Sequence, residues 1–161
     1  MKDAMIVIAK FNQLQNRKLL ALLDGLTDEQ RKKDVGTNYT FGSIHGALDR
    51  MAGTLAMSLN MLKDDGPGGP GGPGGPDAGT AKYDMEDYEA LKAKILETDA
   101  AYVAGFEAIS EEKCVAGPGV PLYDMVMKGM FIANFVRGAV CQALKAEYGI
   151  SSDLISGALL S

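Results

Sequence analysis

Apolar side chains recur every three or four positions in four long segments of the chain. This spacing places them on one side of a helix, and no segment shows the alternation of apolar and polar residues that is typical of a strand. The pattern predicts helices over residues 2–25, 42–63, 85–110 and 121–149. Four long helices without a strand pattern predict an all-α fold, a four-helix bundle.

Local signals mark where these helices begin and end. Residues 27–30 read Thr-Asp-Glu-Gln, which is a capping box with Thr27 as the N-cap. This motif predicts a short helix that ends near Asp34. Gly25 and Gly149 suit the C-terminal ends of the first and last long helices, and Pro121 suits a first helical turn.

A Gly/Pro segment, GPGGPGGPGGP, occupies residues 66–76. Glycine stands at every third position, as in collagen, but a collagen helix needs many more triplets and three chains. We predict a flexible loop between the second and third long helices, within a single domain over residues 1–161. This loop and the stretch at 25–42 are the connections able to cross the bundle, so a strict up-and-down order does not follow.

Composition and charge exclude several classes of function. The chain has 161 residues, is 47% apolar and carries a net charge of −5 without a dense Lys/Arg stripe. Nucleic-acid binding and docking on an anionic membrane are therefore disfavoured. No apolar run approaches the roughly 20 residues of a membrane span, and the N-terminus lacks the features of a secretory signal. The two cysteines form no CxxC motif, which favours a reduced, cytoplasmic protein.

Four segments resemble motifs of the DinB-like proteins. FNQLQNRKLLALL at 11–23 resembles the first-helix pattern of that family, and FGSIHGAL at 41–48 resembles its Gly-Ser-Ile-His-Gly motif. VRGAVCQAL at 136–144 resembles the His-Arg-Gly-Gln stretch of the last helix, and SSDLI at 151–155 resembles the closing segment. The resemblance implies a four-helix bundle, often dimeric, in which three histidines hold a divalent metal.

The resemblance also implies where the metal ligands would stand. One falls on His45, the only histidine of the chain, and the other two fall on Ile132 and Val136. Hydrocarbon side chains have no electron pair to donate, and a metal site of this kind typically takes three protein ligands. We therefore expect no metal. Zinc or nickel at His45, with Asp49 one turn later as a second ligand, is the alternative.

The pocket that the resemblance implies would contain His45, Asp49, Lys128, Ile132 and Val136. A lone histidine is usually structural, so His45 is expected to hydrogen-bond Asp49, a hydroxyl group or a backbone carbonyl. Alternatively, His45, Asp49 and Lys128 form a polar remnant that binds a small anion or acts as a weak acid–base pair. Ile132 and Val136 are expected to pack into the interior.

Three functions remain open at the level of the sequence. The first is a homodimeric, metal-free binding or scaffold module whose degenerate pocket takes a small molecule or whose surface takes a partner. The second is a metal-dependent enzyme of the thiol S-transferase or hydrolase type that uses non-standard ligands. The third is a stress-related protein that binds a partner through its dimer surface or its Gly/Pro loop. Self-association is expected from the resemblance and from the nine methionines of the chain.

Overall fold

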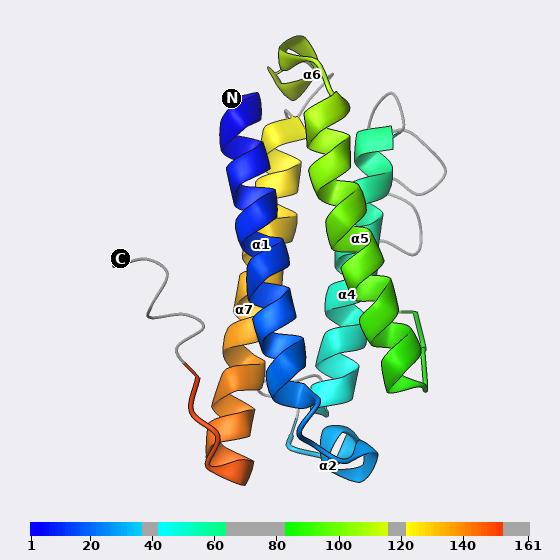
Figure 1. Ribbon diagram of the computed structural model, residues 1–161, viewed down its shortest axis with the longest axis vertical. Coiled ribbons are helices and arrows are strands. Elements are labelled where there is room, and N and C mark those ends of the chain that lie inside the picture. The colour runs from blue at the N-terminus through cyan, green and yellow to red at the C-terminus, as the bar shows by residue number, and fades with distance from the viewer. Residues whose placement is uncertain (37–41, 64–82, 116–121, 153–161) are drawn as a thin grey trace.

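The computed structural model describes residues 1–36, 42–63, 83–115 and 122–152 (Figure 1). The regular secondary structure of these ranges consists of helices, apart from one isolated backbone bridge between Gly36 and Gly42, which confirms the predicted all-α class. Four long helices lie side by side, and two short ones stand at opposite ends of the molecule. The helices are α1 (Lys2–Leu23), α2 (Asp28–Lys32), α4 (Ile44–Lys63), α5 (Tyr88–Ala108), α6 (Glu111–Val115) and α7 (Leu122–Tyr148).

The capping box and Gly149 act as predicted, whereas Pro121 lies outside the described residues. The Thr27 hydroxyl accepts a hydrogen bond from the Gln30 backbone N–H at 3.2 Å, and the Gln30 side chain accepts one from the Thr27 backbone N–H at 2.8 Å. This capping box starts α2, which ends at Lys32, two residues earlier than expected. Gly149 follows α7 with φ +66°, the left-handed conformation that commonly ends a helix.

The third predicted helix differs most from the structure. It was expected over residues 85–110, but α5 begins at Tyr88, where the Asp87 side chain accepts from the Ala90 backbone N–H at 2.7 Å. The backbone turns extended again at Ile109, and the separate short helix α6 follows. Because α6 has only five residues, it is too short to show an apolar period.

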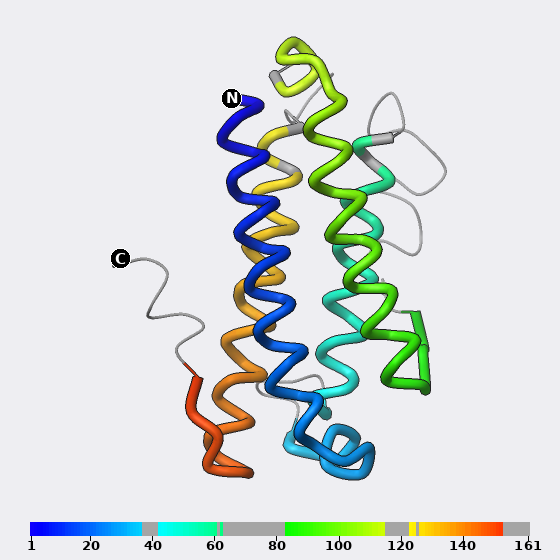
Figure 2. Tube along the Cα trace, in the orientation of Figure 1, coloured from blue at the N-terminus to red at the C-terminus, as the bar shows by residue number. Residues whose placement is uncertain are grey.

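The order of helix directions is not up-and-down. Colours along the chain show α1 and α7 running one way and α4 and α5 the other (Figure 2). Lys2, at the start of α1, contacts Glu107 near the end of α5, whereas Asp49, early in α4, binds the backbone at Tyr83, just before α5. The parallel pair α4 and α5 therefore needs a connection that returns along the molecule. The predicted Gly/Pro loop at 66–76 belongs to that connection and lies outside the described residues.

The core fills the space between the four long helices. Tyr102 and Phe106 on α5 are its largest side chains, with ring centroids 5.6 Å apart. The other large, fully buried side chains are Met5, Leu19, Leu20, Leu23, Ile44, Leu48, Met51, Leu55, Leu91 and Ile95. No helix in the described ranges combines the length and the hydropathy of a membrane span.

Candidate functional site

His45 lies in the first turn of α4 and is buried. Its Nε2 lies 2.6 Å from the backbone carbonyl oxygen of Met85. Since a carbonyl oxygen only accepts, Nε2 carries the proton and donates it in this bond. Nδ1 is buried and has no hydrogen-bond partner in the described part of the chain. The partner of the His45 ring is thus a backbone carbonyl forty residues away.

Asp49 lies one turn after His45 and binds the same segment. Its carboxylate accepts backbone N–H groups from Tyr83 at 3.1 Å, from Asp84 at 3.2 Å and from Met85 at 3.3 Å. Asp84 has φ +52°, a conformation that is uncommon for a residue other than glycine. We name His45 and Asp49 the α4 clamp, because together they hold residues 83–85 in place ahead of α5.

The other three predicted site residues lie on α7 in two different environments. Val136 is buried in the core, as expected, but Ile132 is 43% exposed and Lys128 is also exposed. The expectation that Ile132 packs into the interior is therefore wrong. Four residues turn a helix by about 400°, so Ile132 stands about 40° from Val136 around the axis, and this rotation carries it out of the core.

Val136 is also at a different height from the α4 clamp. The antiparallel helices α4 and α7 touch at Ser58 and Gly129, where a Cβ built on the glycine would lie 2.6 Å from the serine hydroxyl. At about 1.5 Å per residue, His45 lies about 20 Å from this contact along the helices, and Val136 lies about 10 Å from it in the same direction. The five predicted residues thus occupy three environments: clamp, core and surface.

The residues that the structure describes around His45 do not fit a divalent metal. Within the described ranges, no three His, Cys, Asp or Glu side chains gather closely enough to hold an ion. His45 offers one free nitrogen, and the oxygens of Asp49 already accept three backbone N–H groups. A metal site with three protein ligands would need two further ones beside His45.

A buried polar network, which the sequence reasoning missed, joins three helices. One nitrogen of Arg137 donates to the side-chain oxygens of Asn12 at 2.6 Å and of Asn16 at 2.5 Å. The amide nitrogens of these two residues donate to Asp99 at 2.9 and 3.0 Å. All four side chains are buried, so two amides bridge a charge pair inside the core. The available signal was the pair of asparagines four residues apart on the apolar side of α1.

Burial controls the protonation of this network. Loss of solvent raises the pKa of Asp99 to about 6, although hydrogen bonds from Asn16 and the charge of Arg137 act in the opposite direction. Loss of solvent also lowers the pKa of Arg137 to about 10, against the attraction of Asp99. The four bridging side chains are buried, and the second terminal nitrogen of Arg137 donates to Asn134 on the same helix at 2.5 Å. The network is therefore suited to specify how α1, α5 and α7 pack rather than to meet a substrate.

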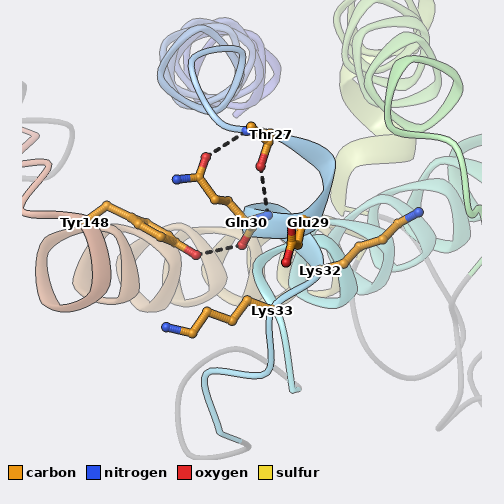
Figure 3. A pocket seen from close by; sticks show the side chains of 6 residues that line it. All are labelled: Thr27, Glu29, Gln30, Lys32, Lys33 and Tyr148. Atoms are coloured by element: carbon orange, nitrogen blue, oxygen red, sulfur yellow. Dashed lines mark hydrogen bonds between the residues drawn. The ribbon is translucent and has the colours of Figure 1, made fainter.

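Two surface hollows that are lined by described residues are poor candidates for a small-molecule pocket. The larger, about 680 Å³, lies beside α2 and is lined by Thr27, Glu29, Gln30, Lys32, Lys33 and Tyr148 (Figure 3). Its two lysine side chains point in opposite directions, and each forms an ion pair with an acidic residue. The smaller, about 120 Å³, lies between α4 and α5. Ligand sites are usually larger than the second and more apolar than the first.

Apolar side chains are instead exposed on the outer side of α7. Phe131 is 73% exposed and Phe135, one turn later, is 62% exposed, with Ile132 beside them. We name these three residues the α7 apolar face. Val7 and Leu14 are exposed on the neighbouring helix α1, which packs beside α7 through the polar network. Phe131 and Phe135 are the two most exposed aromatic side chains among the exposed large apolar residues of the described chain.

The chain matches no protein-family model, no curated protein and no solved structure. The resemblance to DinB-like proteins therefore remains an expectation that rests on four short segments. What the protein does has to follow from its own side chains.

Proposed function

We propose that this protein is a divergent, DinB-like four-helix bundle that acts as a metal-free protein-interaction module. The observation that carries the proposal is the α7 apolar face. Soluble single chains rarely expose large contiguous apolar patches unless these bind something, and aromatic residues are enriched at protein interfaces. Phe131 and Phe135 present two rings to solvent at the same side of one helix.

The remaining surface and the former ligand positions support the same proposal. The backbone of residues 83–85 binds both side chains of the α4 clamp, and the one ring nitrogen of His45 that it does not bind is buried. The two hollows offer a charged, open lining or very little volume. An interaction surface is therefore better supported than a small-molecule pocket, a metal-dependent transferase or a metal-dependent hydrolase.

Calorimetric titration with zinc and nickel tests the metal-free part of the proposal. The chain is purified without a metal-affinity tag, and His45→Ala is the comparison variant. We expect no stoichiometric binding to either protein, because His45 and Asp49 alone supply too few ligands. Tight binding of one metal ion per chain that disappears in His45→Ala would contradict the proposal and restore the metalloenzyme alternative.

A second measurement tests whether the α7 apolar face is uncovered in the single chain. The variant Phe131→Glu/Phe135→Glu should change the free energy of unfolding of the monomer by less than about 1 kcal/mol, since exposed substitutions usually have small effects. Urea denaturation is followed at a concentration where sedimentation shows only monomer. A loss of about 3 kcal/mol or more would mean that another part of the chain covers the rings, which would overturn the proposed interaction surface.

A further inference from the structure

We infer that a segment of the same chain, residues 153–161, folds back along α7 and covers the α7 apolar face until a binding partner displaces it. The inference rests on the proposed function and adds the regulation of that same surface. Residues 153–161 lie outside the described ranges. The inference comes from the four described residues before them and from the surface that lies ahead of these four.

The chain reverses its direction directly after α7. Gly149 has φ +66°, and the Ile150 backbone N–H donates to the carbonyl oxygen of Leu144 at 3.2 Å. Two residues later, the Ser152 hydroxyl donates to the sulfur of Cys141 at 3.1 Å. These successive contacts move back along α7, and the stretch that follows the helix lies beside its last turns (Figure 2). Residue 153 therefore starts at the level of Cys141.

The α7 apolar face lies ahead of this returning chain. Each residue turns a helix by about 100°, so Gly138, Phe131 and Phe135 stand about 60°, 80° and 120° around α7 from Cys141, all in the same sense. Gly138 has no side chain, which leaves room for another stretch of backbone to pass close to the helix. The route from Ser152 to the two rings therefore leads over a glycine.

The segment is long enough to reach both rings. At about 1.5 Å per residue, Phe135 lies about 9 Å and Phe131 about 15 Å before Cys141 along the axis of α7. Nine residues span about 30 Å when they are extended. The segment therefore reaches beyond both rings, with length left for a turn.

The composition of the segment suits an apolar surface. Its only charged side chain is Asp153, at the first position. Its large apolar side chains form two pairs, Leu154 with Ile155 and Leu159 with Leu160. Two apolar pairs can contact two rings that stand one turn apart on α7. Contact with the rings removes these side chains from water, which is favourable.

The cover is weak enough for a partner to displace it. Fixing nine residues costs conformational entropy, which offsets much of the gain from burial. We expect a ratio of covered to uncovered chains of about four, which lowers the apparent affinity for a partner about fivefold. A factor of five corresponds to about 1 kcal/mol. The cover is therefore compatible with the small change in unfolding free energy expected for Phe131→Glu/Phe135→Glu.

Acrylamide quenching of a single tryptophan tests the inference. The chain has no tryptophan, so Phe135→Trp reports on this face alone. The tail variant is the full chain with four substitutions: Leu154→Ser, Ile155→Ser, Leu159→Ser and Leu160→Ser. We expect the quenching rate constant of Phe135→Trp to be about fivefold higher in the tail variant, because the uncovered fraction rises from about one-fifth to one. The matched control is Ala100→Trp on the exposed side of α5, whose quenching should not respond to the tail substitutions.

Paramagnetic broadening of backbone amide signals tests where the segment lies. A nitroxide is attached at Ser156→Cys in a chain that also carries Cys141→Ser, while Cys114 is buried. We expect the amide signals of the α7 apolar face to be lost to broadening, whereas those on the exposed side of α5 should keep their intensity. Chemical reduction of the nitroxide should restore the lost signals.

Two results would overturn the inference. The quenching of Phe135→Trp would rise less than about twofold on the tail substitutions, or the nitroxide would broaden another surface in place of the α7 apolar face. Either result leaves this face exposed to a partner, so the proposed function would stand without this regulation. The failure of the inference is therefore distinguishable from the failure of the proposed function.

Discussion

At the scale of single residues, the core of this protein is specified by polar side chains as well as by apolar packing. Asn12 and Asn16 each accept from Arg137 with their oxygen and donate to Asp99 with their nitrogen. An amide has both functions, so two asparagines can connect a cation and an anion that lie on different helices. This arrangement satisfies buried groups that apolar neighbours could not.

The pKa of Asp99 predicts an unusual pH dependence of stability. The pKa is about 6 in the folded chain against an ordinary value of 3.8, so between these pH values the folded state holds a proton that the unfolded state has released. The free energy of unfolding should therefore fall as pH rises from about 4 to about 6, by up to about 3 kcal/mol from this group. Asp99→Asn should remove that fall, as measured by urea denaturation across this range.

A control variant separates the effect of Asp99 on the pH dependence from the effects of the other carboxylates of the chain. Glu97→Gln changes an exposed carboxylate two residues away and should keep the wild-type pH dependence. If Asp99→Asn and the wild type showed the same slope between pH 4 and pH 6, the buried carboxylate would not hold a proton in the folded state, and the prediction would fail.

Asp49 offers a second test at the residue scale. Asp49→Ala removes the acceptor of three backbone N–H groups and should lower the free energy of unfolding by about 1–3 kcal/mol. Amide hydrogen exchange should accelerate at residues 83–85 while α1 retains its protection. Asp3→Ala removes an exposed carboxylate from α1 and should change neither quantity. Unchanged exchange at 83–85 in Asp49→Ala would show that the clamp does not hold this segment.

At the scale of secondary-structure elements, glycines decide how closely helices approach. Gly129 on α7 faces Ser58 on α4, and a Cβ there would lie 2.6 Å from the serine hydroxyl. Gly105 on α5 faces Leu62 on α4, where a Cβ would meet the leucine at an ordinary contact distance of 3.5 Å. An added Cβ at Gly129 would therefore clash with α4, whereas an added Cβ at Gly105 would fit.

This difference predicts opposite effects of the same substitution. Gly129→Ala should destabilise the fold by about 1–2 kcal/mol, because overpacking exceeds the gain in helix propensity. Gly105→Ala should be neutral or stabilising by up to about 1 kcal/mol, since it gains the same propensity without a clash. Urea denaturation of both variants is the measurement. Equal effects would contradict the close approach of α4 and α7, and Ser58→Gly should rescue Gly129→Ala if the approach is real.

At the scale of the whole molecule, the parallel pair α4 and α5 makes the length of their connection important. Asp49 binds the backbone at Tyr83, so the chain must return from the end of α4 at Lys63 to this level. The fourteen residues of α4 between these levels correspond to about 21 Å. Residues 64–82 supply the chain for this return.

Chain length alone predicts which deletions are tolerated. Deleting residues 67–75 leaves ten connecting residues, which reach about 36 Å when extended, so the fold should keep its unfolding midpoint. Deleting residues 66–80 leaves four, which reach about 17 Å and cannot span the distance. This second variant should lose the contacts of Asp49 or unfold, as followed by circular dichroism in urea. Equal stability of the two deletions would contradict the parallel order of α4 and α5.

The four long helices and the short capped helix α2 followed from the sequence, because their signals are local. Apolar residues at intervals of three and four give a helix one side to bury, and this holds for any neighbouring element that covers it. The capping box at Thr27 and the glycine at 149 act on the backbone within a few residues of themselves. These conclusions need only the geometry of a single helix. The placement of Val136 in the core came instead from the resemblance, which also placed Ile132 there, and the structure bears out only Val136.

The tertiary structure decided the rest, because it depends on which elements meet. Residues 85–87 look like the first turn of a helix, but His45 and Asp49 on α4 bind the backbone of Met85, and α5 begins only at Tyr88. Ile132 stands only about 40° from Val136 on the same helix, and the position of the neighbouring helices leaves one exposed and the other buried. Two partners of Arg137 come from α1, more than a hundred residues earlier, and no local pattern specifies such a distant contact.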